Sequence, residues 1–130
     1  MRRRLLIVPA LLALVVALVT APARAEQKFL VFFGQWSAEL EPAARDVVAA
    51  AVAYAKANPA MRVEIFGFSS AAGSQQANLY LSLLRAQLVS DMLTGAGIEP
   101  ARLSRVAEGA VNAVGSEEES RRVEIVVRAR

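Results

Sequence analysis

The sequence predicts an α+β fold, a two-layer sandwich in which two helices cover one face of a sheet, in the order β-α-β-α-β-β. Two observations predict it. Short segments rich in β-branched and aromatic residues alternate with two longer segments whose apolar residues recur at helical spacing. Glycine and proline lie between these segments, where turns are needed. Helices that follow strands in this way pack on the sheet and bury one common core.

The first strand and the first helix have clear signals. Lys28–Phe33, with the sequence KFLVFF, is typical of a strand. Pro42 suits the first turn of a helix, where its missing N–H costs nothing. Ala43–Ala57 is dominated by alanine and carries valines on one helical stripe. Asn58 and Pro59 end this helix.

A second strand and a second helix follow. Met61–Phe66 alternates buried-type and exposed-type residues, which is the period of a half-buried strand. Gly67–Gly73 is expected to be a turn. Gln75–Leu93 has apolar residues at helical spacing, and Gly95 and Gly97 end the helix.

Two strands remain in the last third of the chain. Arg102–Val106 is expected to be a short strand, and Arg122–Val127, with the sequence RVEIVV, the last one. Glu108–Ser120 between them is predicted to be a loop. The carboxylates of its acidic run, Glu117–Glu119, could bind a cation, but a solvent-exposed loop explains such a run more simply.

The first 25 residues are typical of a secretory signal peptide. A basic start, MRRR, precedes an apolar run of about 16 residues, and Ala23-Arg24-Ala25 has the small-x-small form of a cleavage site. An uncleaved membrane anchor is the alternative, although the run is shorter than the ~20 residues that a spanning helix needs. We therefore expect one domain at residues 26–130 and no transmembrane span after cleavage.

Charge and composition exclude several classes of protein. Cleavage would remove four of the 15 basic residues and leave 11 against 12 acidic ones, so nucleic-acid binding has no compositional support. The chain has no histidine and no cysteine, which excludes Ser-His-Asp and Cys-His catalysis and the usual zinc sites. Gly67–Ala71 follows a strand, but it lacks the last glycine of a nucleophile elbow and has no imidazole to activate a serine. We expect neither an enzyme nor a bound cofactor or metal.

Four segments resemble one known family. Val31–Pro42 (VFF, then SAEL-x-P), Ala101–Gly109 (ARLSRVAEG) and Arg121–Val127 (RRVEIVV) are similar to its opening strand and helix start, third strand and closing strand. Asn78–Ala86, NLYLSLLRA, fits the N-x-x-L-S-x-x-R-A helix and is the most specific match. On these residues the chain, over nearly all of its length after residue 25, resembles the OmpA C-terminal-like domain, which holds bacterial envelope proteins to the cell wall.

The resemblance implies a ligand, the zwitterionic end of diaminopimelate in the peptidoglycan stem peptide, and a periplasmic location near the cell wall or outer membrane. It assigns the ligand carboxylate to Arg85 and makes Asn78 a neighbouring polar contact. A guanidinium suits this role because it presents paired donors to a carboxylate. The alternative is a structural arginine that ties its helix to the last strand or to a loop carboxylate, such as Glu108 or one of Glu117–Glu119.

The sequence departs from the family where the ligand ammonium should bind. Ser70 stands where the family has an aspartate, and Phe68 where histidine is common. A serine hydroxyl accepts a hydrogen bond but brings no countercharge. We count Ser69, Ser70, Asn78 and Arg85 as the candidate ligand-binding residues and expect weakened or altered diaminopimelate binding.

A second function remains open at this point. The fold could have lost the ligand and act as an interaction module for another envelope protein, through exposed aromatic residues. Trp36, Phe68 and Tyr80 are the candidates for such a surface.

Overall fold

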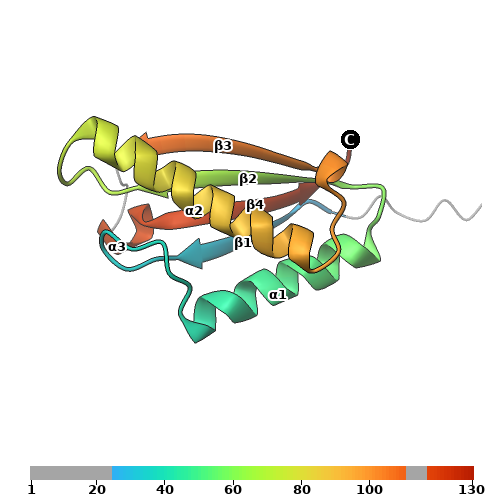
Figure 1. Ribbon diagram of the computed structural model, residues 1–130. Coiled ribbons are helices and arrows are strands. Elements are labelled where there is room, and N and C mark those ends of the chain that lie inside the picture. Colours follow the sequence, from blue (N-terminus) through green and yellow to red (C-terminus); the bar gives the residue numbers. More distant parts are fainter. Residues whose placement is uncertain (1–24, 111–116) are drawn as a thin grey trace, which may run out of the picture.

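The computed structural model describes residues 25–110 and 117–130, and these residues form one sandwich of helices on a sheet (Figure 1). The predicted signal peptide lies outside the described residues except for Ala25. The elements, in chain order, are β1 (Gln27–Phe32), α1 (Pro42–Ala57), β2 (Arg62–Ser69), α2 (Gln75–Gly95), a 3₁₀ turn η1 (Pro100–Arg102), β3 (Leu103–Ala110), α3 (Glu117–Ser120) and β4 (Arg122–Arg128).

The sheet has four strands in the order β1-β4-β2-β3. β4 is antiparallel to both of its neighbours, and β2 and β3 run parallel because α2 connects them. The predicted α+β sandwich is thereby confirmed. The order places the last strand in the middle of the sheet, so the two ends of the described chain lie next to each other in β1 and β4.

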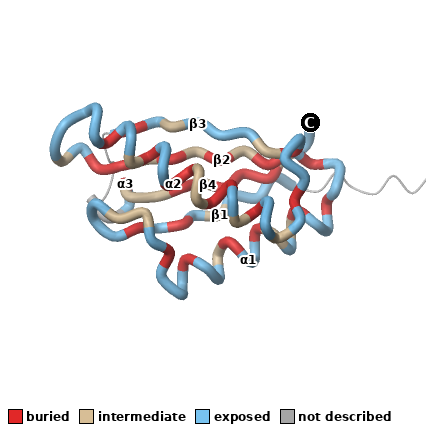
Figure 2. The backbone as a smooth tube through the Cα atoms, viewed as in Figure 1, coloured by how far each residue is buried: buried red, intermediate tan, exposed pale blue. Residues whose placement is uncertain are grey.

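The core lies between the sheet and the two long helices, as the burial colours in Figure 2 show. Alternate residues of β2 and β4 face it, and β2 follows the predicted alternation, with Val63 and Ile65 fully buried. Val123 and Ile125 of β4 pack beside them. This alternation is what a sheet covered on one face requires.

The buried face of α2 changes character along the helix. Its second half buries Ala86, Val89 and Leu93, as predicted. Its first half instead buries the polar side chains of Asn78, Ser82 and Arg85. These three residues lie over the end of β2, so this part of the interface is polar where the rest is apolar.

Gly67 explains how close α2 comes to β2. A Cβ on Gly67 would overlap the backbone carbonyl of Ser82, so only glycine fits there. The hydroxyl of Ser82 accepts a hydrogen bond from the backbone N–H of Gly109 in β3 at 3.1 Å. The start of α2 is therefore held against both β2 and β3.

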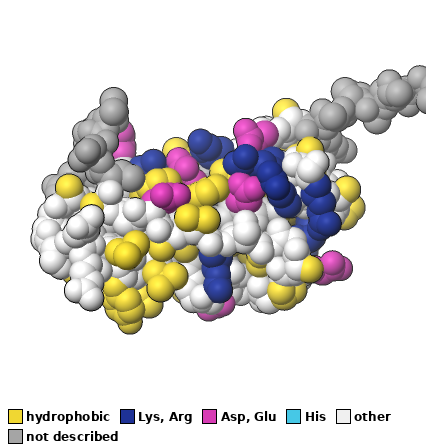
Figure 3. Space-filling model, turned by 90° about the horizontal axis from the view of Figure 1, so that it is seen from above, with side chains coloured by type: hydrophobic (Ala, Val, Ile, Leu, Met, Phe, Trp, Pro, Cys, Tyr) yellow, Lys and Arg dark blue, Asp and Glu magenta, His cyan; other side chains and the backbone are white. Residues whose placement is uncertain are grey.

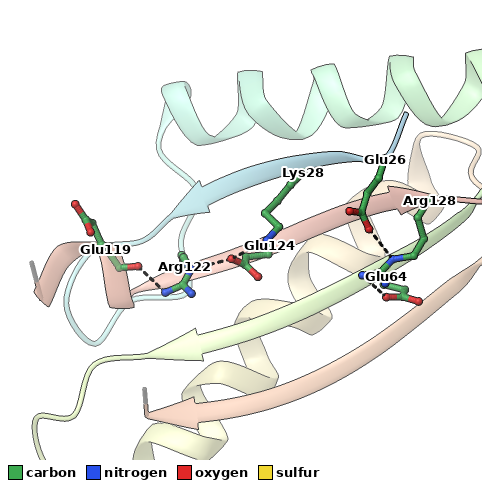
Figure 4. Close-up of polar contacts among 7 residues, drawn as sticks. All are labelled: Glu26, Lys28, Glu64, Glu119, Arg122, Glu124 and Arg128. Atoms are coloured by element: carbon green, nitrogen blue, oxygen red, sulfur yellow. Dashed lines mark hydrogen bonds and ion pairs between the residues drawn. The ribbon is translucent and has the colours of Figure 1, made fainter. Parts of the chain in front are cut away.

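Opposite α2, the sheet has a face lined by ion pairs (Figure 4). Arg128 contacts Glu26 at 3.1 Å and Glu64 at 3.0 Å. Arg122 contacts Glu124 at 3.3 Å on the same face. Exposed pairs of this kind contribute little stability each, but they keep this face polar.

The structure differs from the predicted elements at the site end of the sheet. β2 extends to Ser69 and β3 to Ala110, so the loop predicted from Glu108 is wrong in its first three residues. A register shift follows Gly67, and Gly109 adopts φ +71°, a bulge that residue patterns do not reveal. The acidic run forms the short helix α3, where the start of a helix favours acidic residues.

Within residues 25–110 and 117–130, no helix has the length and apolar character that crossing a membrane requires.

Candidate functional site

Arg85 lies at the centre of the polar interface between α2 and the loops at one end of the sheet. Its side chain is fully buried, with 0% exposure. Nε donates to the carbonyl of Ser37 at 2.8 Å, one terminal nitrogen donates to Gly34 at 3.0 Å and the other to Phe68 at 3.3 Å. The guanidinium thus joins the loop between β1 and α1 to the end of β2.

These partners are backbone carbonyls and not carboxylates. Among the described residues Arg85 makes no ion pair, so the pairing with Glu108 that the structural reading proposed is not found there. The side chains of Glu117 and Glu118, which that reading also offered, lie outside the described part of the chain. A guanidinium has five N–H donors, and the three carbonyls use three of them. The positive charge at this site is held by dipoles and has no countercharge in the described residues.

A second cation lies next to Arg85. Nε of Arg121 donates to the carbonyl of Phe33 at 3.2 Å, and the Phe33 ring centre lies 5.2 Å from Cζ of Arg85. Burial and, to a smaller extent, repulsion from Arg121 together lower the pKa of Arg85 to about 10. Arg85 therefore stays charged at neutral pH. An anion bound beside it would reduce its repulsion from Arg121.

Only one of the two adjacent arginines, Arg121 and Arg122, is on the side of Arg85. Arg122 points to the other face of the sheet, where its Cζ lies 4.2 Å from the ring centre of Phe68. Arg121 is the residue before β4, and it lies on the side of Arg85, because both guanidinium groups contact Phe33. The alternation of side chains along a strand predicts that only one of them can do so, but not which one.

Ser69 and Ser70 are buried beside these cations, at 0% and 5% exposure. The hydroxyl of Ser69 has no hydrogen-bond partner among the described residues. Such an unpaired buried hydroxyl costs about 1–3 kcal/mol, so it is unusual in a folded protein. Ser120, which precedes Arg121, is also buried, at 1%. Its place in the site was not predicted.

Asn78 holds the turn that leads into α2. Its side-chain nitrogen donates to the carbonyl of Ala72 at 2.5 Å and to that of Ser74 at 3.0 Å. Ser74 caps the helix by accepting from the backbone N–H of Ala77 at 3.1 Å. Asn78 is 1% exposed, so its position here is that of a turn-stabilising residue under the site.

Trp36 connects the same two loops from outside. It is 52% exposed and adopts φ +52°, a left-handed conformation that is rare for a tryptophan. A Cβ on Gly73 would lie 2.6 Å from Cη2 of its indole, so the ring packs directly on the glycine backbone. Trp36 and Arg85 thus fix one loop from opposite sides.

The chain contains an independent example of a buried arginine bonded to carbonyls. Arg102 is 9% exposed and donates to Ala55, Asn58 and Met61 at 2.9–3.0 Å, at the end of α1 where a cation meets free carbonyls. Arg102 is a structural tie. The Arg85 site differs from it in two respects, the second guanidinium of Arg121 and the unpaired hydroxyl of Ser69.

These features combine in one architecture. Two long helices cover one face of a four-stranded sheet, and buried guanidinium and hydroxyl groups lie at the loop end of that sheet. No group of three or more acidic, histidine or cysteine residues in the described part of the chain is placed to hold a metal ion. The sequence profile of the OmpA family matches residues 32–124, so the chain belongs to the OmpA family. This confirms the resemblance that the sequence suggested.

Comparison with individual proteins agrees with this membership. The peptidoglycan-binding protein ArfA of Mycobacterium bovis and of Mycobacterium tuberculosis is 36% identical over 101 residues, which covers 73% of this chain. The chain spans only 31% of the length of these relatives.

Solved structures share the fold. A putative MotB-like protein from Desulfovibrio vulgaris is 28% identical, with a TM-score of 0.66, and the match covers 81% of this chain and 76% of that one. The peptidoglycan-associated lipoprotein from Burkholderia pseudomallei superposes with a TM-score of 0.71 at 24% identity, over 77% of this chain and 90% of its own.

Proposed function

We propose that this protein is a non-catalytic module of the bacterial envelope that associates with peptidoglycan through the site around Arg85, and that it binds diaminopimelate more weakly than the family pattern implies. The signal-peptide pattern at residues 1–25 supports a periplasmic location. The observation that carries the proposal is the pair of guanidinium groups, Arg85 and Arg121, at the loop end of a fold whose relatives include a peptidoglycan-binding protein.

A carboxylate suits the donors that remain. Two N–H groups of Arg85 are left over by its three carbonyl partners. Because the side chain is fully buried, a ligand reaches it only if the loop carrying Gly34 and Ser37 moves. Binding would then exchange carbonyl acceptors for a carboxylate, which makes shorter and stronger bonds with a guanidinium.

The weakened affinity follows from Ser70. When the ligand ammonium has no charged acceptor, the binding free energy falls by roughly 1.5–3 kcal/mol, which weakens the affinity about ten- to more than a hundredfold. Ser70 is 5% exposed and neutral, and it follows the end of β2, where Arg85 contacts the carbonyl of Phe68. The site therefore retains the part that binds the carboxylate, and the part that would bind the ammonium is changed.

Co-sedimentation of the purified protein with peptidoglycan sacculi tests the proposal. We expect the wild-type protein to sediment weakly, Ser70→Asp to sediment more strongly, and Arg121→Gln to remain in the supernatant. Arg122→Gln is the matched control, because it removes the same charge one residue away on the opposite face. The proposal is wrong if neither the wild type nor Ser70→Asp sediments, or if both glutamine variants behave alike.

A second candidate function rests on the outer face of α2. Where the first half of this helix buries polar residues, it exposes apolar ones, namely Leu79 (49%), Tyr80 (62%), Leu83 (46%) and Leu84 (39%). Figure 3 shows hydrophobic side chains gathered at the end of the molecule where α2 begins. Such a patch is typical of a protein-binding surface, and Trp36 and Tyr80 are exposed as the interaction reading expects.

Crosslinking in intact cells separates the two functions. A crosslinked partner that is lost with Leu83→Glu, while Arg121→Gln leaves it unchanged, supports the interaction module. Recovery of wall peptide with the wild type and with Leu83→Glu, but not with Arg121→Gln, supports the wall-binding module. Both variants are at exposed or half-exposed positions, so neither is expected to unfold the protein.

A further inference from the structure

We propose that the site selects a carboxylate whose neighbouring amine is acylated, and discriminates against one that carries a free ammonium. This inference rests on the proposed function and names its ligand class. In peptidoglycan, an acylated end of this kind is a stem-peptide residue whose side-chain amine is already joined in an amide cross-link. An uncross-linked end is a zwitterion.

The charge at the site is the first argument. Arg85 and Arg121 lie close enough to repel one another, and both are bonded to backbone carbonyls, of residues 34, 37 and 68 for Arg85 and of Phe33 for Arg121. A carboxylate neutralises one of these charges. A free ammonium two bonds from that carboxylate would bring a third cation into the same buried space, where charges are poorly screened.

The neutral groups at the site are the second argument. Ser69, Ser70 and Ser120 are all at least nine-tenths buried and offer hydroxyl groups. The Ser69 hydroxyl has no partner within residues 25–110 and 117–130, and it lies on the helix-covered face of β2, as Val63, Ile65 and Gly67 do. A hydroxyl pairs well with an amide, whose N–H and C=O are a neutral donor and acceptor, but it cannot neutralise an ammonium.

The position of these groups is the third argument. Arg122 stacks on Phe68, just beyond the last β2–β4 pair, Gly67 and Val123. Because the two strands are antiparallel, Arg121, which precedes Arg122, and Ser69, which follows Phe68, lie at the same end of the sheet. Both alternate with these stacked residues and face α2, where Arg85 lies. The two guanidinium groups and the unpaired hydroxyl are thus on the α2 side of the sheet at its loop end, where a carboxylate with an amide beside it would meet both kinds of group.

A titration with two matched probes tests this inference. The probes are diaminopimelate with one end blocked as the N-acetyl amide and the other end left as a free zwitterion, and the same molecule acetylated on the amine of that free end. Backbone amide shifts of the purified protein, followed by NMR, report binding. We expect the acetylated probe to bind at least about tenfold more tightly, which corresponds to about 1.4 kcal/mol. Shifts should be centred on Gly34, Phe68, Ser69 and Arg121.

Two variants sharpen the result. Ser70→Asp adds a carboxylate, and we expect it to reverse the preference by strengthening the free-amine probe. Ser69→Ala removes the unpaired hydroxyl, and we expect it to weaken the acetylated probe severalfold while the free-amine probe changes little. Circular dichroism melting of each variant establishes that it is folded.

The outcomes separate this inference from the proposed function. Sedimentation with sacculi combined with equal probe affinities, a tighter free-amine probe, or no probe binding overturns the inference but leaves the wall association standing. Failure of sacculi and of both probes to bind overturns both. A preference for the acetylated probe that Ser70→Asp does not reduce also overturns the inference, because its electrostatic cause would then be wrong.

Discussion

Replacing Arg85 with methionine tests whether this residue holds the site together before any ligand arrives. Three hydrogen bonds from a charged donor, at 2.8, 3.0 and 3.3 Å, are lost. At roughly 1.5–3 kcal/mol each, their gross contribution is about 4–9 kcal/mol. The burial of the charge and its repulsion from Arg121 offset part of this. We expect a net loss of about 2–4 kcal/mol in the free energy of unfolding.

Urea denaturation measures this loss, and the protein carries a suitable probe. Trp36 is the only tryptophan in the chain and lies between Gly34 and Ser37 in the loop that Arg85 holds, so its fluorescence reports on that loop. Far-UV circular dichroism reports on the whole fold. The exposed Arg105→Met is the control and should change stability by less than ~0.5 kcal/mol. A loss this small for Arg85→Met as well would refute the structural role that its carbonyl contacts indicate.

Three further predictions concern the same end of the molecule. Ser69→Ala removes an unpaired buried hydroxyl and should stabilise the ligand-free protein by about 1 kcal/mol in urea denaturation; a loss would mean that the hydroxyl has a partner. Gly73→Ala places a Cβ 2.6 Å from the Trp36 ring at φ +81° and should cost about 1–3 kcal/mol, a cost that Trp36→Ala relieves in part but not fully, because the strained φ remains. The folded pKa of Arg85, about 10, lies below its ordinary value, so the folded state binds fewer protons than the unfolded state above that pH. The free energy of unfolding of the wild type should therefore rise relative to that of Arg85→Met as the pH passes about 10; a constant difference would show that the guanidinium is not perturbed.

The sequence was sufficient for the fold because the elements that build it have simple periods. The alternation in Met61–Phe66 and the apolar face of the second half of α2 depend only on neighbouring residues. Glycine and proline mark the ends of the helices for equally local reasons, as at Pro42, the first residue of α1. The family match at Asn78–Ala86 added the connection of these elements into one known sandwich.

The site was predicted less well, because its contacts join residues far apart in the chain. The partners of Arg85 are backbone carbonyls 17 to 51 residues away, and every residue type has such a carbonyl. No sequence pattern marks Gly34 or Ser37 as an acceptor for it. The alternative prediction of a carboxylate partner was a reasonable use of charge, but it assumed that a buried cation needs an anion. Carbonyl dipoles supply the same field, as they do for Arg102.

The first half of α2 buries polar residues that a sequence pattern would expose, and this difference bears on function. A helix normally buries its leucines and exposes its polar residues, but here Asn78, Ser82 and Arg85 are buried while Leu79 and Leu83 are exposed. Each buried polar group has to be satisfied by a particular partner, which restricts the sequence far more than apolar packing does. A helix that served only to cover the sheet would have no reason to keep this arrangement. A site that binds an anion through a buried positive charge would need this arrangement. This is the physical reason to look for the ligand at the end of the sheet where Arg85, Arg121 and Ser69 lie.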